Sequence, residues 1–498
     1  MNMIARYESW WMNASASREK LAVFRVAFFA IVGVDAMLQI SHAPRYGGFN
    51  VANLPIIASV LPELGRTGMM TVWVLQAYLA VRIAVGGATR WAVVALCCLF
   101  GYAYFISQLD SYQHHYLVFL ALVLCCFVRW DRPGKLFAGK LESAWPIRTL
   151  LVVISIVYVF AAIAKLEAAW IDGTALTVQL SKPWVRQIVE SWFGAPIVRD
   201  GALVDAGGYG TVAAILVLAE LFLAIAIHIP KLRIAAFIVG VGLHLGFEFS
   251  GFEIGLFSYF MCAIYTLVLP DRWFVAMGRW LRPAFGMIDG AIASLRSRVT
   301  GSFSATWATA AVCFAGGAAG IAMLPYDGVT AAIVLVIVLG FAGVMERRRG
   351  SDAKRRAVAS MSISHLVACV AIILTSSVTG TARDYHRYWA ASLREMGNIE
   401  QAVPTYERAV ELDPDYAPGH SSLANLYRRT GRHDEALEHY AIAQRLEPDN
   451  WRPYAGEAMT HDAMGRGGPA LEAAQKALAR NPNHGESQRI RARWENAQ

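Results

Sequence analysis

The chain has 498 residues, of which 56% are hydrophobic and only 16% charged, against about 25% charged residues in an ordinary soluble protein. Its formal charge of +8 forms no basic stripe of the kind that binds nucleic acid, so we expect no nucleic-acid partner. The seven cysteines lie in apolar runs and show neither a disulfide framework nor a metal-binding spacing. Together these features indicate a polytopic membrane protein with a polar tail.

Apolar runs recur from residue 20 to residue 380, each long enough to cross about 30 Å of hydrocarbon as a helix. The first follows Arg18 and Lys20 as in a signal peptide, but its length favours a transmembrane helix. The predicted fold is all-α, a transmembrane bundle followed by a polar helical tail, with divisions at 1–290, 291–380 and 381–498. We expect about eleven spans, at 21–40, 67–85, 91–109, 114–129, 147–164, 211–229, 232–249, 253–269, 305–324, 328–345 and 358–378.

Basic residues gather in alternate loops, which the positive-inside rule places in the cytoplasm. These segments are the amino terminus and residues 129–148, 230–233, 270–304 and 347–356. The loops between them, including residues 165–210, are neutral or acidic. With an odd number of spans, the rule predicts a protein of the plasma (inner) membrane whose amino terminus is cytoplasmic and whose tail is extracytoplasmic.

Two segments have the pattern of helices that lie along a membrane surface. In residues 183–194, Trp184, Ile188 and Trp192 recur at helical spacing with charged residues between them. Residues 279–298 read similarly on the opposite face. An ordinary packed loop helix is the alternative for both.

After Gly380 the sequence repeats with a period of 34 residues. Four columns keep this interval, a glycine, two alanines and a proline: Gly397, Gly431, Gly465; Ala402, Ala436, Ala470; Ala409, Ala443, Ala477; Pro414, Pro448, Pro482. Small alanines let paired helices approach closely, and the glycine and proline suit the turns. The period predicts about three tetratricopeptide repeats, a helical solenoid that binds a peptide or protein on its concave face. A purely structural stalk is the alternative.

Ionisable residues inside the predicted spans are candidates for a functional site, since each costs roughly 2.5–3.5 kcal/mol to insert. The candidates occur at the start of the fourth span, the end of the fifth, the middle of the sixth and the outer part of the seventh: His114, His115, Tyr116, Lys165, Glu220, His244 and Glu248. The predicted orientation puts His114, Lys165, His244 and Glu248 at similar depth near the outer surface. One alone would serve as a hydrogen bond between helices, but four at one level favour a shared polar pocket.

A lysine in a poorly hydrated pocket is pushed towards its neutral amine, which can take a proton from a weak acid or attack a carbonyl. Neighbouring histidines and carboxylates can orient a substrate or stabilise an oxyanion. No HxxxH or HExxH spacing is present, so we expect no metal. Lys165 at the mouth of a span has a plainer reading too, in which its stem reaches outward to the water interface.

The stretch Ala164-Lys165-Leu-Glu167-Ala-Ala-Trp170-Ile-Asp172-Gly173 resembles the lysine motif of vitamin K-dependent gamma-carboxylases and their bacterial relatives, the horizontally transferred transmembrane (HTTM) domain proteins. Gln113-His114-His115-Tyr116-Leu117 resembles that family's Asn-His-Tyr-Tyr-Leu signature, with two substitutions. Residues 18–25 and 244–259 are similar as well. The resemblance covers roughly residues 15–270.

This resemblance implies that Lys165 is the base that starts oxygenation of vitamin K hydroquinone or menaquinol, with His114 assisting. The base formed removes a gamma proton of glutamate, O2 and CO2 being the co-substrates. His115, Tyr116, Glu167, Trp170, Glu220, His244 and Glu248 would form the pocket. Unlike the animal enzymes, this chain continues into further spans and repeats, which would present the peptide or protein substrate.

Two other functions compete with a carboxylase-type enzyme. A non-catalytic scaffold would use the repeats to help mature secreted peptides, and its intramembrane polar residues would only join helices. A transporter would show an inverted repeat or paired broken helices, and neither is apparent in the sequence. The lysine motif favours the enzyme.

Overall fold

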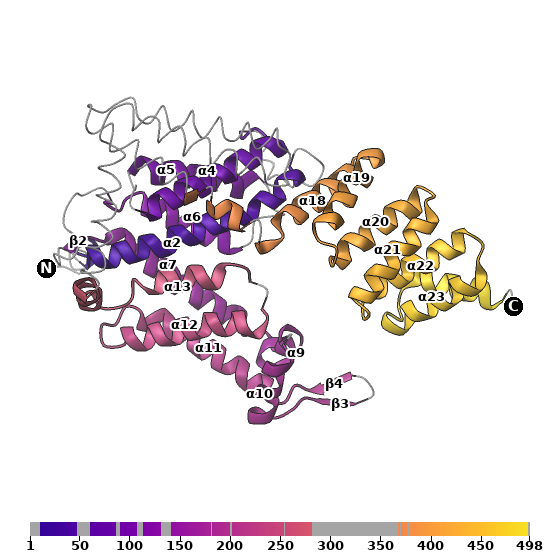
Figure 1. Cartoon of the computed structure of the whole chain (residues 1–498). Coiled ribbons are helices and arrows are strands. Elements are labelled where there is room, and N and C mark those ends of the chain that lie inside the picture. The colour runs from indigo at the N-terminus through magenta and orange to yellow at the C-terminus, as the bar shows by residue number, and fades with distance from the viewer. Residues whose placement is uncertain are drawn as a thin grey trace, which may run out of the picture.

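The chain folds into a bundle of apolar helices followed by a row of shorter paired helices (Figure 1). The computed structural model describes residues 10–46, 60–85, 90–106, 113–130, 141–180, 182–199, 202–252, 254–280, 367–368, 370–375 and 378–496, without the side chains of Gln113, His114, Val178 and Ala202. The expected spans 305–324 and 328–345, most of 358–378, and nearly all of the surface segment 279–298 lie outside these residues.

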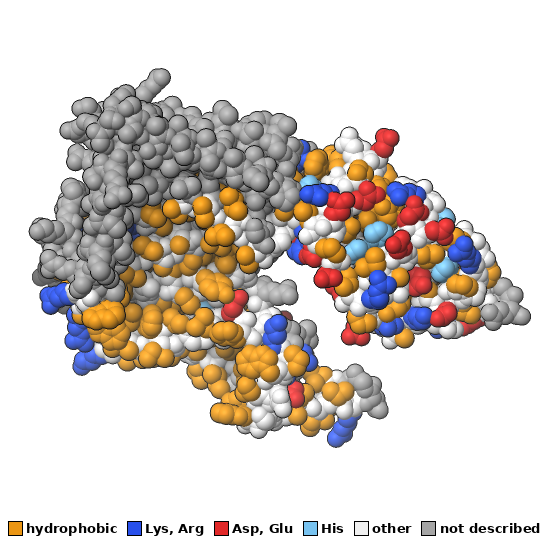
Figure 2. Space-filling model, viewed as in Figure 1, with side chains coloured by type: hydrophobic (Ala, Val, Ile, Leu, Met, Phe, Trp, Pro, Cys, Tyr) orange, Lys and Arg blue, Asp and Glu red, His pale blue; other side chains and the backbone are white. Residues whose placement is uncertain are grey.

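Five helices in the described part are long and apolar enough to cross a membrane: Arg18–Arg45, Arg66–Ala84, Trp145–Ala164, Tyr209–Ala226 and Arg233–Ser250. The first combines α2 (Arg18–Gln39) with the 3-10 helix η1 (Ile40–Arg45), and the others are α4, α7, α11 and α12. They coincide with five of the predicted spans. On the described face of the bundle the side chains are mainly hydrophobic, whereas acidic and basic groups intersperse over the paired helices (Figure 2).

Three predicted spans are shorter helices than expected. Residues 91–109 form α5 (Arg90–Ile106), and residues 114–129 form α6 (Gln113–Cys125). Residues 253–269 form only α13 (Phe257–Tyr265), followed by turns. The late start of α13 has a backbone cause, because Gly251 and Gly255 both adopt positive φ, 85° and 58°, and end regular helix there.

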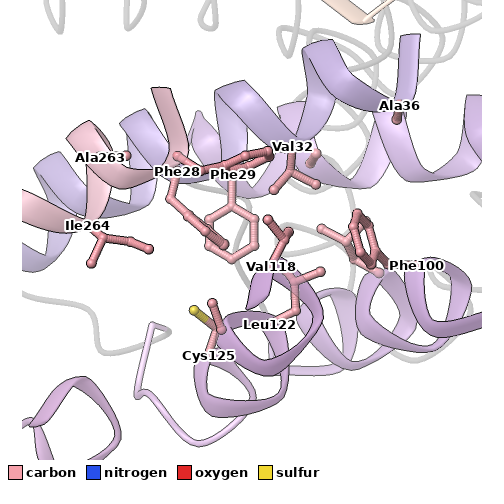
Figure 3. Close-up of a cluster of buried hydrophobic side chains, with 14 of the residues drawn as sticks. Phe28, Phe29, Val32, Ala36, Phe100, Val118, Leu122, Cys125, Ala263 and Ile264 are labelled. Atoms are coloured by element: carbon pink, nitrogen blue, oxygen red, sulfur yellow. The ribbon is translucent and has the colours of Figure 1, made fainter. Parts of the chain in front are cut away.

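One part of the bundle core forms where α2 meets α5, α6 and α13. Phe28, Phe29 and Val32 of α2 are fully buried. They lie among the labelled side chains from the other three helices in Figure 3: Phe100, Val118, Leu122, Cys125, Ala263 and Ile264. This packing of large apolar groups fixes α2, whose far end reaches the polar cavity described below.

Contacts at one end of the bundle join segments that the charge pattern places on a common side. Strand β1 (Ser15–Ser17) pairs antiparallel with β2 (Leu141–Ser143), and Arg18 forms a 2.6 Å ion pair with Glu142. Asp271 accepts hydrogen bonds from the Ser17 backbone N–H and, at 3.1 Å, from Lys20. The amino terminus and the loops near residues 142 and 271 therefore share one end, and Lys165, at the far end of α7, lies at the other.

Between α7 and α11 the chain runs through three short helices and a hairpin: α8 (Ala168–Ile171), α9 (Thr174–Gln179), α10 (Pro183–Phe193), β3 (Ile197–Arg199) and β4 (Ala202–Asp205). A small apolar cluster that includes Leu176, Val189 and Tyr209 fastens this segment to the start of α11. Figure 1 shows the hairpin projecting beyond the bundle. The segment is thus anchored at the end of a candidate span.

The outer face of α10 is apolar and open, as the sequence pattern predicts for a surface helix. Trp184, Ile188 and Trp192 are 53%, 46% and 76% exposed, and tryptophan favours the membrane–water interface. We expect brominated lipids to quench Trp184 and Trp192 in reconstituted protein. The quenchable fraction of the emission should fall in W184F/W192F and stay unchanged in W451F, a control in the paired helices. An unchanged fraction in W184F/W192F would remove this helix from the bilayer surface.

The paired helices follow the 34-residue period. The pairs are α18 (Thr381–Glu395) with α19 (Ile399–Leu412), α20 (Ala417–Arg429) with α21 (His433–Leu446), and α22 (Trp451–Ala463) with α23 (Gly467–Arg480), before a last helix α24 (Gly485–Glu495). The repeating glycines have positive φ, 77°, 79° and 70°, in the turn within each pair. All six repeating alanines are 0% exposed, so the glycine column and both alanine columns act as expected.

The first paired helix packs on the bundle rather than projecting freely. Ser392 of α18 donates a 2.9 Å hydrogen bond to the carbonyl of Pro44 in η1. The guanidinium of Arg66 lies 3.8 Å from the ring centroid of Trp389, and that of Arg45 lies 3.9 Å from the ring of Tyr388. The paired helices α18 to α24, called the array below, are therefore docked at the same end of the bundle as Lys165.

Candidate active site

A cavity of about 1240 Å³ lies between α2, α6, α7, α11, α12 and α13, with the short helices α8 and α9 at its edge. Six of the nine site residues proposed from the sequence line it: His115, Tyr116, Lys165, Trp170, Glu220 and His244. Most of the remaining wall is aliphatic or phenylalanine, including Leu120, Val157 and Phe247. The cavity is large enough for an extended apolar ligand and offers few polar groups to orient it.

Lys165 caps the carboxyl end of α7 and its side chain turns back into the bundle. Its Nζ lies 3.4 Å from the carbonyl oxygen of Ala161, one turn earlier. It donates to both carboxylate oxygens of Glu220, at 2.8 and 3.0 Å, and lies 5.5 Å from the ring centroid of Trp170. The alternative in which this lysine reaches outward to the interface is therefore wrong.

The Lys165–Glu220 ion pair is nearly shut off from solvent. Side-chain exposure is 15% for the lysine and 5% for the glutamate, which sits in mid-helix on α11. A desolvated pair of this kind is held by mutual attraction and is costly to break on one side only. The amine is thus one half of a buried ion pair, and its partner is Glu220, one of the residues proposed from the sequence for the same pocket.

A second polar group in the wall is a chain of three side chains from three helices. The hydroxyl of Tyr158 on α7 lies 2.8 Å from Nε2 of His244 on α12 and 2.6 Å from the hydroxyl of Tyr265 on α13. All three side chains are buried, with His244 2% exposed. Among the described residues, Nδ1 of His244 has no hydrogen-bond partner.

A third polar group joins α2 and α6. Nε2 of His115 lies 3.6 Å from Oδ1 of Asp35, and both side chains are buried. Asp35 and Gln39 contribute to the cavity wall from α2. These two residues, with Tyr158 and Tyr265, escaped the sequence reasoning. Asp35 could have been found, because it is a carboxylate inside the first apolar run, but the tyrosines carry no comparable signal.

Of the other three proposed site residues, Glu167 and Glu248 do not line the cavity. Glu167 is exposed, because the chain leaves the bundle after Lys165 and Glu167 begins α8 at its amino-terminal cap. Glu248 lies one turn beyond His244 near the end of α12, where it accepts a 3.3 Å hydrogen bond from Tyr259 at the surface. The backbone of His114 belongs to α6, but its side chain lies outside the described residues.

The Asp-Gly pair that ends the lysine motif shapes the turn between α8 and α9. Oδ1 of Asp172 accepts a 2.8 Å bond from the Thr174 backbone N–H, which with the Thr174 side chain holds the pKa of Asp172 below its ordinary value. Gly173 has φ of 86°, and a Cβ there would lie 2.2 Å from the backbone nitrogen of Gly210. Glycine is required because α11 begins against this turn.

Comparisons with known proteins agree with the two-part architecture. The family model of the HTTM domain matches residues 13–273, and that of the tetratricopeptide repeat matches residues 389–450. Among solved structures, YrrB, described as a TPR protein with an unusual peptide-binding site, aligns with 17% identity over 31% of this chain and 90% of its own, at a TM-score of 0.21.

Two further solved structures align in the same way. A thermophilic TPR protein of Thermus thermophilus shows 20% identity over 37% of this chain and 98% of its own, at a TM-score of 0.19. The TPR domain of P58(IPK) shows 13% identity over 58% of this chain and 84% of its own, at 0.24. The sequence match and the 34-residue helix pairs, rather than these alignments, identify the repeats.

Proposed function

Because this chain belongs to the HTTM domain family and carries tetratricopeptide repeats after its membrane part, we propose that it is an integral membrane carboxylase that uses a quinol and acts on a glutamate-containing peptide. One observation carries the proposal. The Lys165–Glu220 pair lies in the wall of a large apolar cavity whose other polar groups include His115 and His244. An amine beside a proton acceptor in a dry site is suited to base catalysis.

The cavity fits vitamin K hydroquinone or menaquinol. Such a molecule has a flat ring with two hydroxyls and a long apolar tail. The aliphatic and phenylalanine side chains of the wall match the tail. Nδ1 of buried His244, which has no partner in the described part of the chain, offers a contact for a ring oxygen. When bound, the hydroquinone together with O2 and CO2 supplies the strong base and the carboxyl group of the reaction.

Lys165, with Glu220 beside it, accepts the proton of the bound hydroxyl and stabilises the negative charge that forms. When the proton of the pair rests on Glu220, the Lys165 amine is neutral and its lone pair can accept a proton from a hydroxyl in the cavity. The ammonium then stabilises the oxyanion left behind, while Glu220 keeps its proton and stays neutral beside the ammonium. Trp170 lies over Nζ, which keeps water from this side of the amine.

The repeats suit a protein or peptide partner on the side of the bundle where the lysine lies. The array docks on η1, at the end of α2 that supplies Asp35 and Gln39 to the cavity. The alternating basic loops support an extracytoplasmic location for this end, with about eleven spans in the plasma (inner) membrane. A peptide held by the array would then meet the cavity without crossing the bilayer.

Carboxylation by the purified protein tests the proposal. In nanodiscs with reduced menaquinone or vitamin K, labelled bicarbonate and a glutamate-rich peptide, we expect label in the peptide and epoxide from the quinol. Lys165→Ala should reduce both by about 10²–10⁴-fold, the usual contribution of a general base. Lys182→Ala, at the start of α10 and outside the cavity, is the control. Activity unchanged in Lys165→Ala would remove this lysine from the mechanism.

The same ion pair also favours a second candidate, a non-catalytic membrane scaffold that uses the repeats to bind a secreted peptide. In that case the pair only joins α7 to α11, and the docked array does the work. The scaffold predicts that replacing both residues by methionine keeps partner binding intact, whereas the enzyme predicts that this double variant is inactive.

A further inference from the structure

The hydrogen-bonded chain Tyr265–Tyr158–His244 ends in a buried nitrogen of His244, a residue that lines the cavity. Tyr158 contacts Nε2 of His244 and the hydroxyl of Tyr265, so the chain closes at its tyrosine end. Nδ1 of His244 has no partner among the described residues although the side chain is 2% exposed. A buried polar atom left without a partner is destabilising, so such an atom on a residue of a cavity wall points to a ligand.

The surroundings hold the imidazole in place. The rings of Phe247 and Phe257 lie edge-on to it, with centroids 6.0 and 5.4 Å away. Tyr265 occupies space that only a glycine leaves, because a Cβ on Gly240 would lie 2.0 Å from its Cζ. The imidazole is therefore preorganised, and its free atom is in a fixed position relative to the cavity.

The chain can exist in two proton arrangements. With the proton on Nδ1, Nε2 accepts from Tyr158, Tyr158 accepts from Tyr265, and Nδ1 is a free donor. With the proton on Nε2, the direction of both bonds reverses and Nδ1 is a free acceptor. One atom can therefore accept from a hydroxyl and, after the tautomer changes, donate to a carbonyl, which are the two forms of a ring oxygen in a quinol and a quinone.

We propose that Nδ1 of His244 is the hydrogen-bonding anchor for one ring oxygen of a quinol or quinone in this cavity, and that the tyrosine chain lets it bind both redox forms. This inference rests on the proposed function only for the kind of ligand. It makes His244 a binding residue, distinct from the Lys165–Glu220 pair.

Substituting His244 by asparagine or by glutamine tests the roles of its two ring nitrogens separately. Asparagine places a polar atom near Nδ1 and none near Nε2, and glutamine does the reverse. The probe is 2,3-dimethyl-1,4-naphthoquinone, and its binding is followed in nanodiscs by quenching of tryptophan emission. The quenching measured in W170F comes from the other tryptophans, so subtracting it leaves the signal of Trp170 at the cavity. We expect His244→Asn to keep the dissociation constant within about threefold and His244→Gln to raise it about tenfold or more, as for one lost buried hydrogen bond.

The opposite order, with His244→Gln binding normally and His244→Asn binding weakly, would show that only the Tyr158 contact matters and would overturn the inference. Equal affinity in both variants would also overturn it, and the proposed function would stand. Failure of the quinone to bind the wild-type protein would overturn both this inference and the proposed function. If His244→Gln does not fold, Tyr158→Phe decides: binding within about threefold supports the anchor, and a tenfold loss contradicts it.

Discussion

Glu220→Ala is expected to destabilise the membrane part severely, because it leaves the Lys165 ammonium buried without its counter-charge. The carboxylate is 5% exposed and accepts both hydrogen bonds that the ammonium donates to side chains. Removing one partner of such a pair costs about 3–5 kcal/mol. Thermal unfolding in detergent, followed by the loss of monodisperse protein, should show a midpoint several degrees below that of the wild type.

A double-mutant cycle shows whether this loss belongs to the pair. Lys165→Met and Glu220→Met should each destabilise, whereas the double variant should lie close to the wild type, since an apolar replacement of a buried pair is often neutral. The exposed pair Lys476–Glu472 in α23, at 2.7 Å, is the control, and its removal should change stability by less than about 1 kcal/mol. Additive losses at the buried pair would mean that the two charges act independently.

The sequence predicts the helical elements well because their patterns are local. Apolar runs define five of the spans, and the 34-residue columns of glycine and alanine define the paired helices. The predicted spans fail where the cause is a single backbone position, as at Gly251 and Gly255 before α13. Nothing in the hydropathy of that run distinguishes a glycine in left-handed conformation from one inside a helix.

The membrane depths that the charge pattern assigns to these residues predict only some of the residues that line the cavity. Lys165 at the end of one span and Glu220 in the middle of another do not share a level in the sequence. They meet because a side chain on a helix points towards the amino terminus, and the long lysine stem extends this reach by about a turn. His244 and Glu248 are expected at the same depth, but they are one helical turn apart. Only His244 lies deep enough to line the cavity, and Glu248 bonds to Tyr259 at the surface.

The position of the array is beyond any local pattern. Its hydrogen bond between Ser392 and Pro44 joins residues 348 apart in the chain, and the arginine–aromatic stacks beside it use residue types that are common on any surface. No period or motif marks Arg66 or Trp389 as partners. This contact nevertheless determines which end of the bundle the repeats occupy.

Trp389→Ala is expected to release the array from the bundle. Trp389 receives the guanidinium of Arg66 at 3.8 Å and packs against the apolar core at the start of the array. A cation–π contact between partly buried groups contributes about 0.5–2 kcal/mol, so the undocked population should grow roughly 2- to 30-fold. Hydrogen exchange should report this as a loss of amide protection in η1 and in α18.

The control is Trp451→Ala, which removes a partly buried tryptophan whose ring lies 4.6 Å from that of His484, away from the bundle. It should loosen α22 and α24 while leaving the protection of η1 unchanged. If Trp389→Ala also leaves η1 protected, the Ser392–Pro44 bond and the Arg45–Tyr388 stack hold the array without it. Loss at η1 alone in the Trp389 variant would instead show that the docked array orders the end of α2, and with it Asp35 and Gln39 in the cavity wall.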